Sequence, residues 1–172
     1  MSLPDQNTRS IFFVFIPVLI FALVLQIIRL PESIDVNRPN IIILVLIFFG
    51  LINPKRINVE FAWLVGLILD LLTGAPLGIN AFLLATQIYL ITSQFKRFPQ
   101  YAVWQQSFII CMVNVVVNVI GYWFEHIIGQ GTYDLNVWIP SVVLGVLWPI
   151  VYFLLLIACR SFSVPVNNEK SD

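Results

Sequence analysis

The feature that most limits the fold of this chain is a series of long apolar runs, rich in Leu, Ile, Val and Phe, that recur at helix length. In a lipid bilayer every backbone N–H and C=O group must be hydrogen-bonded inside the protein, so such runs are typical of membrane-spanning helices. A membrane β-barrel would alternate apolar and polar residues instead. The composition, 59% hydrophobic and only 10% charged, agrees with helices in lipid. We therefore expect an all-α integral membrane protein.

Six apolar segments predict a six-helix transmembrane bundle. They cover residues 11–28, 41–52, 57–72, 79–95, 104–128 and 138–159. The second is short, because its helix would reach only about 18 Å against a bilayer core of about 30 Å. It would cross by thinning the bilayer or by packing inside the bundle. We divide the chain into a cytoplasmic N-terminus (1–10), a six-span domain (11–160) and a polar cytoplasmic C-terminal tail (161–172).

The distribution of Lys and Arg favours one orientation of this bundle. With six spans and the N-terminus inside, seven basic residues are cytoplasmic and two lie outside, as the positive-inside rule requires. The cytoplasmic set is Arg9, Lys55, Arg56, Lys96, Arg97, Arg160 and Lys170, and the outer pair is Arg29 and Arg38. If the short second segment does not cross, a five-span arrangement with the N-terminus outside places eight basic residues in the cytoplasm and one outside. Both arrangements put the C-terminus in the cytoplasm.

One acidic residue lies deep in the third segment. Asp70 is roughly 20 Å along a helix that opens at Ile57, and a carboxylate at the centre of a bilayer costs about 2.5–3.5 kcal/mol on insertion scales. A partner is therefore expected. The nearest candidates are the free backbone amides of the turn at 78–80, just before the fourth segment.

The residues after Asp70 predict a tight helix–turn–helix. Gly74 supplies a left-handed position that ends one helix, Pro76 prevents its continuation, and Asn80 is expected to cap the next. The full motif is Asp70, Thr73, Gly74, Pro76, Gly78 and Asn80. We favour Asp70 as a brace of this hairpin, and a ligand or proton site is the alternative.

Two segments carry polar residues at helical spacing. The fifth has Ser107, Cys111, Asn114, Asn118, Tyr122 and Glu125 on one face, and the fourth has Asn80, Gln87 and Gln94 at intervals of seven. Amides in a membrane usually hydrogen-bond between helices, so we interpret both stripes first as packing contacts. The alternative is a polar ligand cavity lined by Gln87, Asn114 and Asn118. Ser141 and Gly145 predict a close-approach face on the sixth segment.

Reactive motifs are absent from the sequence. It contains no HExxH, GxSxG, GxxxxGK[ST] or CxxC pattern, so we expect neither enzymatic activity nor a cofactor. His126 beside Glu125 lacks the further ligands that zinc needs, so no metal site is expected. Glu60 and Asp70 would be roughly 15 Å apart along one helix, too far to share a proton. Nine basic and nine acidic residues balance, and nothing indicates nucleic acid as a partner.

The order of several short motifs resembles the rod shape-determining protein MreD family of bacterial inner membranes. The motifs are Arg38-Pro39-Asn40, Gly66 to Asp70 with the turn through Gly74 and Gly78, Trp104-Gln105-Gln106, and Leu147-Trp148-Pro149. The resemblance covers roughly residues 26–162. Two features depart from what we expect of the family: Leu144 stands where an amide is expected, and the tail after Val164 is longer and more polar.

The resemblance implies a non-catalytic subunit of the machinery that organises lateral peptidoglycan synthesis in rod-shaped cells. Its implied partners are MreC, the MreB filament and the RodA polymerase with its transpeptidase, within the lipid bilayer; self-association is left open. The family's bundle is also similar to the substrate-binding S-components of energy-coupling-factor transporters. A small-molecule-binding subunit of a vitamin-type transporter is therefore the alternative. From the family we carry over only Asp70, Gly74 and Gly78 as the motif that matters most.

Overall fold

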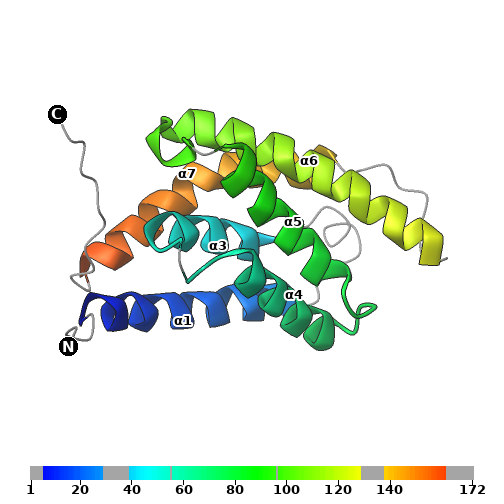
Figure 1. Ribbon diagram of the computed structural model, residues 1–172, viewed down its shortest axis with the longest axis horizontal. Coiled ribbons are helices and arrows are strands. Elements are labelled where there is room, and N and C mark those ends of the chain that lie inside the picture. Colours follow the sequence, from blue (N-terminus) through cyan, green and yellow to red (C-terminus); the bar gives the residue numbers. More distant parts are fainter. Residues whose placement is uncertain (1–5, 29–38, 55, 96, 129–137, 162–172) are drawn as a thin grey trace.

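The computed structural model describes residues 6–28, 39–54, 56–95, 97–128 and 138–161, and six α-helices form nearly all of this part (Figure 1). The helices are α1 (Gln6–Ile27), α3 (Ile41–Ile52), α4 (Val59–Thr73), α5 (Ile79–Gln94), α6 (Val103–Ile128) and α7 (Trp138–Ser161), with a 3₁₀ turn η1 (Phe98–Gln100) before α6. The expected all-helical fold is confirmed. The ends of the chain, 1–5 and 162–172, lie outside the described residues.

The short helix α3 lies at the centre of the bundle. Asn40 caps it as the sequence predicts, its side-chain oxygen accepting the N–H of Ile42 at 3.2 Å. Every residue from Ile42 to Phe49 is buried, and α3 packs against α1, α5 and α7. A helix that is apolar on all sides belongs in a core. The short second segment was expected either to thin the bilayer or to pack inside the bundle. In the structure, α3 packs inside the bundle.

Aromatic contacts fix the neighbours of α3. The ring of Phe15 on α1 lies 4.9 Å from that of Phe49, and the ring of Phe48 lies 5.6 Å from that of Tyr152 on α7. Both pairs are edge-to-face, an arrangement that stabilises beyond the buried area. The first and last helices are therefore held together through α3.

Helices α4 and α5 form a tight hairpin in which a glycine permits close approach. A Cβ atom built on Gly66 would overlap the backbone of Ala81 on α5 and lie 2.7 Å from the carbonyl oxygen of Asn80. Only a residue without a side chain fits there. The missing side chain at Gly66 therefore allows the short distance between α4 and α5.

Helices α6 and α7 pack through the small residues expected on the sixth segment. A Cβ atom on Gly145 would lie 3.1 Å from Cys111 Cβ and 3.2 Å from the carbonyl oxygen of Ser107, both on α6. Ser141, one turn earlier on the same face, is fully buried. The close-approach face is confirmed, because small side chains let the two backbones come together.

The chain reverses direction at each helix, so alternate helix ends gather at the same end of the molecule. The start of α1 and the ends of α3, α5 and α7 lie at the left of Figure 1, and the α4–α5 turn and the end of α6 lie at the right. Two helical stretches, Val103–Phe124 and Trp138–Ser161, are long and apolar enough to cross a membrane; Ile11–Ile27 and Ile41–Ile52 are shorter. The number of crossings stays a prediction.

Two helix starts differ from those expected. Helix α1 begins at Gln6 rather than Ile11, since a helix end outside the apolar layer accommodates polar residues. Helix α4 begins at Val59 rather than Ile57, because the Asn58 side chain accepts the N–H of Phe61 at 3.1 Å and so caps the helix. Pro54 and the turn before Asn58 lie outside both helices.

Candidate functional site

The carboxylate of Asp70 lies buried at the junction of α4 and α5. Its side chain is 0% exposed, and its two oxygens accept backbone N–H groups from Gly78 at 2.8 Å and Asn80 at 3.0 Å. A longer bond, 3.4 Å, comes from the N–H of Ala81. Hydrogen bonds to an ionised group are the stronger kind, and the start of a helix favours negative charge. The predicted contact between Asp70 and the amides of the turn is present.

The cap of α5 differs from the one expected. Helix α5 begins at Ile79, so Gly78 holds the cap position and makes no side-chain capping bond. Asn80 lies inside the first turn, where its side-chain nitrogen donates to Asp70 Oδ1 at 2.9 Å. The prediction that Asn80 caps this helix was therefore wrong. The acceptor that a cap residue normally supplies comes from Asp70, one helix earlier.

The turn between the two helices has a glycine at each end. Gly74 ends α4 with φ +70° and Gly78 precedes α5 with φ +101°, both in the left-handed region. The Thr73 hydroxyl donates to the carbonyl oxygen of Leu69 at 2.8 Å, and the carbonyl of Pro76 accepts the N–H of Ile79 at 3.4 Å. The six motif residues thus form one compact turn around Asp70.

A second polar cluster joins three helices. Gln87 on α5 donates to Asn114 Oδ1 on α6 at 2.9 Å, and Asn114 donates to Ser141 Oγ on α7 at 3.0 Å. Asn118 donates to the same hydroxyl oxygen at 3.1 Å. The structure therefore brings together the three amides that the sequence singled out. Ser141, expected only as a small packing residue, is their common acceptor.

The geometry of this cluster is that of a packing contact. Gln87 is 3% exposed and Asn114 is 5% exposed, so almost no water-sized space opens onto them. Their amides are occupied by one another, as expected for polar groups between membrane helices. Gln94, predicted to share this face, is exposed and does not belong to the cluster. The side chain of Glu125 lies outside the described residues.

A third polar contact ties the 3₁₀ turn to α7. Gln106, 4% exposed, donates from Nε2 to the carbonyl oxygens of Phe98 at 3.1 Å and Tyr101 at 3.2 Å. Its Oε1 accepts the indole N–H of Trp148 at 3.1 Å, and Trp148 is completely buried. In the sequence, Gln106 and Trp148 stand out only as parts of two family motifs. Their pairing across 42 residues had no signal in the sequence.

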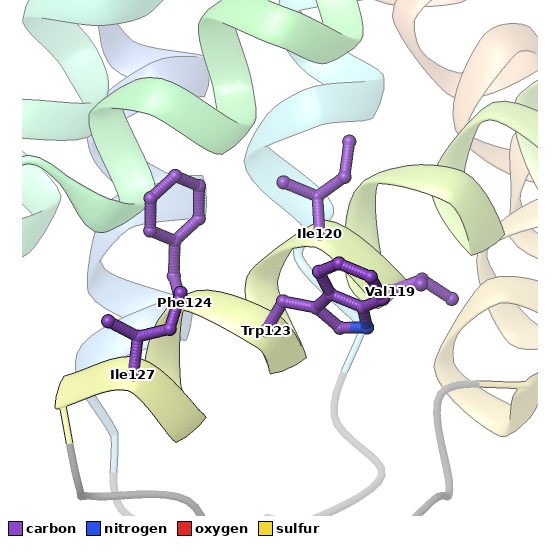
Figure 2. A pocket seen from close by; sticks show the side chains of 5 residues that line it. All are labelled: Val119, Ile120, Trp123, Phe124 and Ile127. Atoms are coloured by element: carbon purple, nitrogen blue, oxygen red, sulfur yellow. The ribbon is translucent and has the colours of Figure 1, made fainter.

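The end of α6 carries an apolar hollow of about 390 Å³ (Figure 2). The lining residues within the described part of the chain all come from this helix: Val119, Ile120, Trp123, Phe124 and Ile127. Trp123 is 67% exposed and Ile127 is 80% exposed. Its described lining side chains are hydrocarbon apart from the indole nitrogen of Trp123, and a small-molecule site normally has several converging polar groups.

Comparison with known proteins supports the motif order. The family profile described as rod shape-determining protein MreD matches residues 7–157, which include all three polar contacts. The chain belongs to the MreD family. A Haemophilus influenzae protein named "Rod shape-determining protein MreD" is 24% identical over 152 residues, covering 87% of this chain and 94% of that protein. No solved structure matches, and the expected similarity to transporter S-components stays a prediction.

MreD membership has consequences for the whole chain. The protein is a helical membrane protein of the bacterial inner membrane, and it has a role in rod-shape determination. Leu144, which departs from the expected family pattern, is fully buried on α7 and lies within the matched residues. The unusual tail after Val164 lies outside both the matched residues and the described ones.

Proposed function

We propose that this MreD-family protein is a non-catalytic scaffold of the cell-elongation complex, holding MreC and the wall synthases together in the inner membrane. The single observation that carries the proposal is the use of its buried polar groups. All five polar residues buried in the described part of the chain are hydrogen-bonded to protein groups. They are Asp70, Gln87, Gln106, Asn114 and Ser141.

Each of these bonds fixes one segment against another. Asp70 joins α4 to α5, the amide cluster joins α5, α6 and α7, and Gln106 joins η1 to α7. A catalyst or a substrate carrier would instead present buried polar groups to its ligand. Among the described residues, one buried side-chain atom, Gln26 Oε1 on α1, has no hydrogen-bond partner, whereas all five buried polar residues bond to protein groups. A bundle that uses its buried polar residues in this way is suited to hold a fixed shape for partner subunits.

The proposed topology has six spans with both termini in the cytoplasm. The alternation of helix directions in Figure 1 supports it, since the ends of α3, α5 and α7 lie at the same end of the molecule. Arg56 and Arg97 follow α3 and α5 in the chain, and Arg160 is in the last turn of α7. This end would face the cytoplasm and the MreB filament. The α4–α5 turn would face outward.

The experiment is co-purification of MreC with this protein from host membranes. We expect MreC to be recovered with the wild type and with Glu60→Gln, an exposed control on α4, and to be reduced several-fold with Asp70→Ala or Gly78→Val. Each variant is first checked for a monodisperse profile in detergent, so that loss of fold is separated from loss of assembly. Equal recovery of MreC with the wild type and with well-folded turn variants would show that the turn is not part of the assembly surface. Failure of the wild type to recover MreC would contradict the scaffold itself.

A further inference from the structure

Three arginines lie exposed at one end of the bundle, each next to a different helix end. Arg56 follows α3, Arg97 follows α5, and Arg160 is in the last turn of α7. All three helix ends are at the left of Figure 1. We call these three residues the basic rim. Within the described residues, none of them forms a salt bridge.

Two members of the basic rim belong to helices that pack against each other, since Arg56 follows α3 and Arg160 is in the last turn of α7. Helices α3 and α7 run in the same direction, and Phe48 packs on Tyr152 with ring centroids 5.6 Å apart. Arg56 and Arg160 each follow one of these rings by eight residues. The guanidinium of Arg56 also lies 5.5 Å from the ring centroid of Phe12 on α1, a cation–π contact that limits its freedom.

The third member stands on a braced turn. Arg97 precedes η1, whose Phe98 is buried and whose carbonyl oxygens at Phe98 and Tyr101 accept hydrogen bonds from Gln106. Because Gln106 holds the backbone carbonyls of this turn, Arg97 is attached to an ordered segment of backbone. Less conformational entropy is then lost when it binds a ligand.

We propose that the basic rim binds the phosphate groups of anionic phospholipids. Guanidinium groups pair with phosphate through two parallel hydrogen bonds, and basic residues between helices at the cytoplasmic side of membrane proteins suit anionic headgroups. The rim carries positive charge without a protein counter-charge among the described residues. Anionic lipid supplies the missing charge without a further subunit.

The surroundings of the rim favour lipid over an acidic protein segment. Exposed apolar side chains accompany two of the arginines along the chain: Trp104, seven residues after Arg97, is 72% exposed, and Ile157, three residues before Arg160 on α7, is 63% exposed. Tryptophan and arginine at helix ends lie at the level of the headgroups. The rim is carried by helix ends and short connections, which place the charges against the bilayer rather than out in the aqueous phase.

The test is lipid binding by the full chain in a nonionic detergent, measured by native mass spectrometry with phosphatidylglycerol and phosphatidylcholine as probes. We expect phosphatidylglycerol to bind about tenfold more tightly or better, and its affinity to fall as salt is raised. Each substitution Arg56→Gln, Arg97→Gln or Arg160→Gln should weaken it about fivefold, and the three together about a hundredfold. Arg→Lys changes should retain most of the affinity, and Gln100→Ala, an exposed change on η1, should have no effect.

Unfolding temperatures, measured alongside, should match the wild type for Arg97→Gln and Arg160→Gln because both side chains are exposed. Arg56→Gln should lower the unfolding temperature slightly, because it removes the cation–π contact with Phe12. Equal affinity for the two lipids would overturn the proposal. So would a triple Gln variant that is folded and binds phosphatidylglycerol as the wild type does. If that variant keeps its lipid affinity but loses an acidic protein from host membranes, the rim is a protein-docking surface instead. None of these outcomes depends on the elongation role.

Discussion

The carboxylate of Asp70 accepts the backbone N–H of Gly78 at 2.8 Å, and through this bond the end of one helix caps the beginning of the next. Gly78 has no side chain with which to cap α5, and it takes a positive φ of +101°. The charge buried in α4 and the unsatisfied amides of α5 therefore stabilise each other. Neither would be tolerated alone in an apolar environment.

Replacing Asp70 should destabilise the α4–α5 hairpin more than replacing an exposed residue on the same helix. Asp70→Ala leaves the N–H groups of Gly78 and Asn80 buried without an acceptor, and we expect a loss of about 3 kcal/mol or more. Asp70→Asn keeps one oxygen and should cost less, about 1–2 kcal/mol. The measurement is thermal unfolding in detergent, with Glu60→Gln as the control expected within about 0.5 kcal/mol. An unchanged midpoint for Asp70→Ala would contradict the capping role.

Two glycines of the same hairpin should respond differently to the same substitution. Gly66→Ala introduces a Cβ atom that overlaps the backbone of Ala81, so α4 and α5 must separate and protein yield should fall sharply. Gly74→Ala meets no atom within 4 Å and pays only for φ +70°, about 1–2 kcal/mol. Folded yield by size-exclusion chromatography compares the two directly. A milder effect at Gly66 than at Gly74 would show that the helices are not in such close contact.

The amide cluster should behave as a coupled unit. Asn114→Leu removes the acceptor for Gln87 and one donor to Ser141, and Gln87→Leu removes one of the same bonds. Interhelical hydrogen bonds in membranes are worth about 1 kcal/mol each. A double-mutant cycle on unfolding free energies should give a coupling of that size between positions 87 and 114. The exposed Gln94→Leu should show no coupling to Asn114, and additive effects at 87 and 114 would argue against a direct bond.

The contact of Gln106 with Trp148 predicts a graded loss at η1. Trp148→Phe removes only the indole N–H and some ring volume, whereas Gln106→Leu also frees the carbonyl oxygens of Phe98 and Tyr101. We expect faster amide hydrogen exchange around residues 98–101 in Gln106→Leu than in Trp148→Phe. The α4–α5 turn, at the other end of the bundle, serves as the internal reference. Unchanged exchange at 98–101 in both variants would mean that Gln106 does not hold this turn.

Local interactions were predictable from the sequence and contacts between distant helices were not. The partner of Asp70 could be predicted because its amides follow within eleven residues, and the bounds of α3 could be predicted from Asn40 and Asn53. The cap of α5 was misassigned because an acceptor from another helix replaced the expected local one.

Helical periodicity places Asn114 and Asn118 on one face, but it does not say which helix that face meets. Ser141 is 27 residues from Asn114, and Trp148 is 42 residues from Gln106, so both contacts depend on how α7 is rotated against α6. That rotation follows from the close packing at Gly145, a tertiary property. The sequence likewise left open whether α3 thins the bilayer or packs inside the bundle, because this depends on its contacts with other helices.

The most direct test of the scaffold is the shape of host cells when this protein is depleted. We predict that the cells lose their rod shape and round up, while incorporation of wall precursor becomes dispersed instead of following the side wall. Wild-type protein should restore the rods, and Asp70→Ala, at matched membrane levels, should not. Cells that remain rod-shaped on depletion but require a nutrient supplement would contradict the scaffold and indicate a transport role instead.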